Sequence, residues 1–242
     1  MSNPWFKCKQ FEIKQDHCAQ KVGTDSFLLG AWVNLNNAVK VLDIGTGTGI
    51  LSLMCAQRSN ATITAIEIDK DAFAQSVQNI NSSPWAYRIH VFNQSLKQFE
   101  TCREEFDVII SNPPYFQHSL TSPNCQRTMA RHACTLTLND IVAFSDTHLT
   151  KAGQLSLIIP VMLFDEFMEM ISSKKWFAYR ITKVFPKPGK EAHRILITCG
   201  KKEEETKYNQ ITIETTKRHI YTPEFYALTN EFYLEMNWTN IT

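Results

Sequence analysis

The sequence lacks the features that mark several classes of protein. Its 242 residues contain only 8 Gly and 9 Pro, and 43% of them are hydrophobic, which excludes a collagen-like or disordered chain. The longest apolar run, Leu155 to Phe164, is too short to span a bilayer, and no N-terminal stretch resembles a signal peptide. We therefore expect a soluble, cytoplasmic globular protein.

Paired cysteines are also absent. The seven cysteines are odd in number, and none belongs to a Cys-x-x-Cys pair or to a Cys/His cluster with zinc-ligand spacing. This pattern indicates free thiols in a reducing compartment and predicts no metal site.

Charge is balanced over the whole chain but not along it. The sequence has 25 Lys+Arg against 24 Asp+Glu. Residues 174–202 hold nine basic residues and one acid, Glu191, a net charge of +8 that leaves −7 for the remainder. This basic segment indicates either a solvated lysine-rich surface or a binding site for a polyanion.

From residue 39 onward, short β-branched apolar runs alternate with runs of helical periodicity. This alternation predicts an α/β fold with a mostly parallel sheet. The predicted strands are residues 39–44, 63–68, 89–92, 106–111, 153–160, 181–185, 194–199 and 211–215. The predicted helices are residues 50–57, 72–80, 138–149 and 161–173, with a last helix from about residue 222.

The first 38 residues break this alternation. We expect them to form a small flap, residues 1–38, packed on the edge of the sheet, ahead of a main domain at residues 39–242. Within the flap, Thr24 and Asp25 are predicted to cap a helix over residues 26–33.

Three glycines follow the first predicted strand in the pattern Asp43-x-Gly-x-Gly-x-Gly49. The turn has no lysine for a phosphate loop, and Ile50 breaks the dinucleotide fingerprint. Such a turn lets the backbone approach a ligand closely, with Asp43 orienting it. Glu67, which ends the next strand, can accept both hydroxyls of an adenosine ribose.

The tetrapeptide Asn112-Pro113-Pro114-Tyr115 follows another predicted strand. Two prolines in succession impose a rigid, extended path on the chain. The Asn112 side-chain oxygen and the Pro113 carbonyl could each accept an N–H group of an exocyclic amine, and Tyr115 offers a face for stacking a base. The tetrapeptide is therefore a candidate catalytic site for a reaction at such an amine.

These motifs resemble those of the class I S-adenosylmethionine-dependent methyltransferases. The resemblance implies a Rossmann-like α/β fold, with a mostly parallel, seven-stranded sheet and helices on both faces. It also implies that S-adenosyl-L-methionine is the cofactor, and the family's adenine contact corresponds here to residues 93–95. The implied cofactor-binding residues are Asp43, Gly45, Thr46, Gly47, Gly49, Glu67, Ile68 and Ser95.

Three further stretches, residues 20–32, 130–132 and 184–194, resemble the bacterial tRNA(1)(Val) adenine-37 N6-methyltransferases. This resemblance implies methyl transfer to N6 of adenine 37 in a tRNA anticodon loop, a base that already lies outside a duplex. The implied catalytic residues are Asn112, Pro113, Pro114 and Tyr115. We expect RNA contacts from Arg127, Arg131, Lys187, Lys190 and Arg194.

Other functions remain open at this stage. They are an N-methyltransferase acting on rRNA adenine or a protein glutamine amide, a non-catalytic RNA-binding module, and a dehydrogenase. Intact Asp43, Glu67 and Asn112 argue against the module, and Ile50 argues against the dehydrogenase. We expect no DNA or membrane partner; the sequence leaves the oligomeric state open, with a monomer expected.

Overall fold

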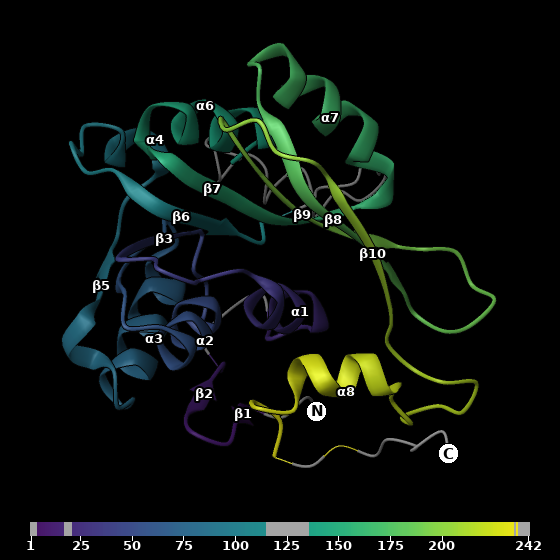
Figure 1. The fold of residues 1–242 in the computed structure, drawn as a ribbon. Coiled ribbons are helices and arrows are strands. Elements are labelled where there is room, and N and C mark those ends of the chain that lie inside the picture. Colours follow the sequence, from purple (N-terminus) through teal and green to yellow (C-terminus); the bar gives the residue numbers. More distant parts are fainter. Residues whose placement is uncertain (1–3, 17–20, 115–135, 235, 237–242) are drawn as a thin grey trace, which may run out of the picture.

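The computed structural model describes residues 4–16, 21–114, 136–234 and 236. Its centre is a sheet in the order β10-β8-β9-β7-β6-β3-β4-β5, in which β9 is antiparallel to both neighbours and the other pairings are parallel (Figure 1). Its strands are β3 (Lys40–Ile44), β4 (Thr62–Ile66), β5 (Ile89–Phe92), β6 (Phe106–Ser111), β7 (Leu149–Pro160), β8 (Phe177–Phe185), β9 (Arg194–Gly200) and β10 (Lys207–Thr212). A separate hairpin consists of β1 (Trp5–Lys7) and β2 (Glu12–Lys14).

The predicted fold class is confirmed. The sheet has eight strands, whereas the resemblance implied seven; the edge strand is β10, which pairs in parallel with β8. Residues 207–210 are polar and exposed, and only Ile211 is buried, so the strand carries little apolar signal. The prediction of residues 211–215 was therefore placed too late in the chain.

Helices cover both faces of the sheet. In Figure 1, α1, α2 and α3 lie on one side of it and α4, α6 and α7 on the other. Two apolar cores result, because the continuous apolar strands bury side chains on both faces. The helices are α1 (Thr24–Trp32), α2 (Ile50–Arg58), α3 (Lys70–Asn81), α4 (Leu96–Phe99), α6 (Leu138–His148), α7 (Phe164–Ser173) and α8 (Pro223–Thr229), with 3-10 turns at Ala86–Arg88 and Val161–Leu163.

Helix α1 packs on a face of the sheet rather than on its edge. It contacts α2, α8 and β7, and residues 27–32 are buried. Trp32 Nε1 donates to Thr182 Oγ1 on β8 at 3.0 Å, which fixes the end of the helix. The division of the chain at residue 38 stays a prediction.

The start of α1 differs from the predicted cap. Gly23 is the N-cap residue, and no side chain caps the helix. Asp25 does not bond to the helix backbone, because its carboxylate accepts from Arg194 Nε on β9 at 2.7 Å. The first turn of α1 is therefore attached to the sheet by an ion pair.

The described residues contain no disulfide, no metal-ligand cluster and no membrane-spanning helix. Cys8, Cys55, Cys102 and Cys199 are free thiols. In the same part of the chain, no cluster of three His, Cys, Asp or Glu side chains could hold a metal ion. None of the helices described here has the length and apolar character needed to cross a bilayer.

Candidate active site

The sequence motifs meet at one edge of the sheet. β3, β4 and β6 are parallel neighbours, so their carboxyl ends lie side by side. Asp43 lies near the end of β3, Glu67 directly follows β4, and Asn112 directly follows β6. The structure therefore brings together the three side chains on which the sequence analysis depends.

The turn between β3 and α2 uses backbone conformations that favour glycine. Gly45, Gly47 and Gly49 have φ angles of +72°, +57° and +85°. The amides of Gly45 and Thr46 both donate to the carbonyl oxygen of Ile66 on β4, at 3.0 and 3.1 Å. This turn is thus held against the neighbouring strand, and a side chain with a Cβ would strain it.

Glu67 fastens the turn from the end of β4. Its Oε2 accepts from the amide of Gly47 at 2.9 Å, and its Oε1 accepts from the amide of Asp69 at 2.9 Å. Burial raises the pKa of this carboxyl, and the two hydrogen bonds lower it in part. Each carboxylate oxygen can accept a further hydrogen bond, so Glu67 retains the capacity to bind two ligand hydroxyls.

Asp43 also stabilises the glycine turn. Its Oδ2 accepts from Thr46 Oγ1 at 2.6 Å and from Ser52 Oγ at 2.7 Å. Its Oδ1 is buried and has no hydrogen-bond partner among the described residues. An unpaired buried acceptor next to a glycine turn is a group that a bound ligand or its water can satisfy. The residues at this turn therefore fit a cofactor with donor groups.

Asp43 should make stability depend on pH. Burial raises its pKa from 3.8 to about 6, so the folded state holds the proton more tightly than the unfolded chain. As the pH rises through this window, the free energy of unfolding falls by about 3 kcal/mol, and the loss is complete above about pH 6. We expect Asp43→Asn, which keeps an oxygen acceptor but no charge, to remove this fall.

Urea unfolding at pH 4 and pH 7 measures the effect. The stability of the Asp43→Asn variant relative to the wild-type protein should increase from the lower to the higher pH. An equal difference at the two pH values would contradict the raised pKa.

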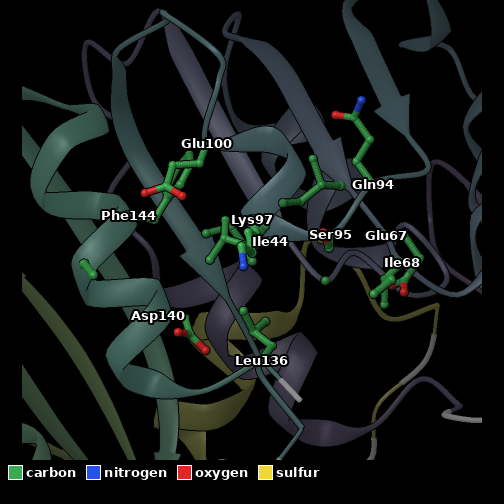
Figure 2. A pocket seen from close by; sticks show the side chains of 14 residues that line it. Ile44, Glu67, Ile68, Gln94, Ser95, Lys97, Glu100, Leu136, Asp140 and Phe144 are labelled. Carbon is green, nitrogen blue, oxygen red and sulfur yellow. The ribbon is translucent and has the colours of Figure 1, made fainter. Parts of the chain in front are cut away.

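A pocket of about 430 Å³ lies beside Glu67. Figure 2 shows Glu67 and Ile68, from the end of β4, on one side of it, and Asp140 and Phe144, from α6, on another. The wall is mostly apolar, and the volume is within the range of small-molecule sites. The pocket therefore fits a planar base whose attached sugar reaches Glu67.

The stretch after β5 lines this pocket, and the side chains of Asn93 and Ser95 in it are already hydrogen-bonded within the protein. Ser95 caps α4, because its Oγ accepts from the amide of Gln98 at 3.2 Å and donates to the side chain of the same residue at 3.0 Å. Asn93 Nδ2 donates to the carbonyl oxygen of Glu67 at 2.8 Å. Ser95 and Gln94 lie on the pocket wall. This stretch therefore both supports Glu67 and bounds the space beside it.

A second pocket, of about 310 Å³, lies between the glycine turn and α1. Its wall includes residues 23–26, residues 45–48, Asn112 and His193. Gly45 lines both pockets, so both border the glycine turn. Together they fit an elongated ligand with an adenosine at Glu67 and a reactive group near Asn112.

Asn112 lies on the wall of this second pocket and is held there by two elements. Its strand is anchored by the preceding Ser111, whose Oγ donates to the carbonyl oxygen of Ile44 at 2.7 Å. Its own Nδ2 donates to Ser26 Oγ on α1 at 3.0 Å. This contact directs the Asn112 carboxamide, and sequence reasoning missed Ser26 because it lies 86 residues away.

The +8 segment does not form one continuous surface. Residues 174–202 fold back on themselves as the antiparallel pair β8 and β9, so the two ends of the segment lie at the edge opposite the glycine turn. The connection between the two strands lies at the same edge as Asn112. Lys187, Lys190 and Arg194 belong to this connection and its end.

Two of these three basic residues have acidic partners. Lys187 Nζ lies 3.0 Å from Glu214 Oε2, and Arg194 pairs with Asp25. Lys190 is exposed and forms no ion pair with another described residue. Among the three, Lys190 is the group most accessible to a phosphate. Three other predicted site residues, Tyr115, Arg127 and Arg131, lie outside the described residues.

The sequence profile of one family, described as the methyltransferase small domain, matches residues 17–163. The chain belongs to this family. It is therefore a methyltransferase. The wall residues of both pockets lie within the matched region, except His193 of the second pocket.

Two curated relatives cover nearly the whole chain. A protein of Tolumonas auensis is 42% identical over 96% of this chain and 98% of its own length, and one of Phocaeicola vulgatus is 43% identical over 98% and 100%. Both are named tRNA1(Val) (adenine(37)-N6)-methyltransferase.

The fold is also found among solved structures. A predicted O-methyltransferase from Agrobacterium tumefaciens superposes with a TM-score of 0.69, covering 90% of this chain and 100% of its own. The two sequences are 22% identical, so this likeness shows only that the two proteins share a fold.

Proposed function

We propose that this protein transfers a methyl group from S-adenosyl-L-methionine to the exocyclic N6 of adenine 37 in the anticodon loop of tRNA1(Val). The observation that carries the proposal is the position of Asn112, which lies beside the glycine turn and has its amide nitrogen engaged by Ser26. The names of the full-length relatives support the choice of tRNA and of atom.

The cofactor site is formed by residues of this chain that the geometry brings together. The Glu67 carboxylate would bind the ribose hydroxyls, and the pocket bounded by Ile68 and Phe144 would take the adenine. Asp43 keeps the glycine turn in place and has one buried acceptor left for the cofactor. When bound there, S-adenosylmethionine supplies a methyl group activated by its sulfonium.

Asn112 orients the amine that receives the methyl group. With Nδ2 donating to Ser26, the Oδ1 atom of Asn112 is the end of the carboxamide that can accept an N–H of the adenine amine. The Pro113 carbonyl would accept the other N–H. Two such hydrogen bonds direct the nitrogen lone pair out of the ring plane, which makes the nitrogen nucleophilic. The proton released after transfer goes to water.

A methylation assay tests the proposal directly. Unmodified tRNA1(Val) is incubated with the protein and labelled S-adenosylmethionine, and the digested nucleosides are identified by mass. We expect N6-methyladenosine from this tRNA and none from a transcript in which adenine 37 is replaced by guanine. Label in both transcripts would contradict the position, and no label in the tRNA would contradict the proposed substrate.

Cell fractionation should place the protein in the cytoplasm.

Lys190 should contribute to tRNA affinity through a phosphate contact, because it is exposed and has no ion pair with another described residue. Replacing it with alanine should weaken binding and reduce the slope of log affinity against log salt by about 1, because about one counterion is released for each phosphate contact. Affinities measured between 50 and 200 mM salt give the slope. An unchanged slope would mean that this lysine only faces solvent.

Arg194 provides the matched comparison, because its guanidinium pairs with Asp25. Arg194→Met should leave the salt slope unchanged while lowering Tm by a few degrees, since it leaves Asp25 without its partner. A slope reduced by about 1 would instead place Arg194 among the phosphate contacts.

A further inference from the structure

Ser26 connects the first helix of the fold to the proposed amine site. Asn112 Nδ2 donates to Ser26 Oγ at 3.0 Å in a partly buried contact. Ser26 lies in the first turn of α1, whereas Asn112 follows β6. Both residues line the pocket at the glycine turn. The contact therefore lies where a substrate amine would have to enter.

The two ends of a carboxamide have opposite hydrogen-bonding roles. Rotation of the Asn112 side chain by half a turn about its last torsion exchanges the oxygen acceptor for the NH₂ donor, and this torsion has no strong intrinsic preference. An NH₂ group facing the adenine amine would place donor against donor. Productive binding therefore requires a carboxamide held with Oδ1 toward the substrate.

We propose that Ser26 is a positioning residue that restrains the Asn112 carboxamide beside the glycine turn. The inference rests on the proposed function and deepens it. By accepting from Nδ2, the Ser26 hydroxyl limits the motion of the side chain and leaves Oδ1 to the substrate. Ser26 acts through Asn112 and needs no contact with either substrate.

The position of Ser26 is itself well defined. The next residue, Phe27, is 1% exposed and belongs to the apolar core, so the helix cannot roll without disrupting packing. The preceding residue, Asp25, is paired with Arg194 on β9 at 2.7 Å. Core packing and this ion pair therefore fix the turn that carries the Ser26 hydroxyl.

Steady-state kinetics of three variants test the role. Ser26→Ala should lower kcat about tenfold, the loss of one hydrogen bond that orients the nucleophile, while KM for tRNA and Kd for S-adenosylmethionine stay within about twofold. Ser26→Thr, which keeps the hydroxyl, should restore most of kcat. Ser173→Ala removes the same group from the end of α7, where the hydroxyl donates to Met170 of the same helix, and should leave kcat unchanged. Equal Tm values for the variants would exclude a loss through unfolding.

A double-mutant comparison decides whether Ser26 acts through Asn112. Single-turnover rates with excess enzyme are measured for Ser26→Ala in the wild-type protein and in the Asn112→Ala background. If Ser26 only orients Asn112, its replacement costs nothing once the amide is gone. A tenfold loss in both backgrounds would overturn the inference, as would an unchanged kcat of Ser26→Ala in the wild-type protein. Failure of the wild-type enzyme to methylate tRNA would instead defeat the proposed function.

Discussion

Replacing Asn112 with alanine is expected to reduce the rate of methyl transfer by about 10²–10³-fold. The variant keeps the fold, because Asn112 is only half-buried and its one hydrogen bond to a described residue is with Ser26. It loses the acceptor that would orient the amine, a kind of contact whose removal typically costs about 10²–10³ in kcat. Single-turnover methylation of tRNA1(Val) measures the rate, and calorimetry with S-adenosylmethionine measures cofactor affinity.

The effect should fall on the chemical step alone. Cofactor affinity of Asn112→Ala should stay within about twofold of the wild-type value, because Glu67 and the glycine turn are unchanged. Asn209→Ala, an exposed carboxamide on the edge strand β10, is the matched control and should methylate at the wild-type rate. Wild-type turnover by Asn112→Ala would remove the amide from the mechanism.

Replacing Glu67 with glutamine is expected to weaken S-adenosylmethionine binding about 100-fold, although the side chain keeps its shape. The two oxygens of Glu67 accept from two different backbone amides, those of Gly47 and Asp69. In glutamine one of these acceptors becomes an NH₂ donor that faces an N–H group, so one hydrogen bond is lost whichever way the amide turns. The glycine turn loses an anchor, and the ribose loses a charged acceptor.

Calorimetric titration with S-adenosylmethionine and with its demethylated product measures this loss. The affinity for both ligands should fall to the same extent, because both contain the ribose. Glu104→Gln, which changes an exposed carboxylate paired with Lys40, is the control and should bind both ligands normally. Unimpaired binding by Glu67→Gln would place the ribose elsewhere.

The central parts of the site could be predicted because their signals are local. Asp43 and the glycines lie on one turn, and Glu67 and Asn112 each directly follow an apolar strand, so strand order alone brings them together. Ser26 could not be predicted in this way, because its contact with Asn112 depends on how α1 packs. Asp25 was misassigned as a cap for the same reason, since its partner Arg194 lies 169 residues away.

Two other features were hidden by the form of the pattern. In the sequence, the nine basic residues of segment 174–202 look like one basic patch. The antiparallel β8–β9 pair places the ends of this segment at one edge of the sheet and its middle at the other. The strand β10 is an edge strand with an exposed polar half, and such strands lack the apolar run by which a buried strand is identified. Both differences arise from tertiary pairing that linear patterns do not encode.

The attachment of α1 at both ends limits how this protein can evolve. The same nine residues contribute Phe27 and Trp32 to the core, Asp25 to an ion pair with β9, and Ser26 to a hydrogen bond with the Asn112 carboxamide. A substitution that shifts the helix is therefore exposed to selection for folding and for turnover at once. An ancestor could diversify its surface loops independently, but this helix and the sheet on which it packs would have to be inherited together.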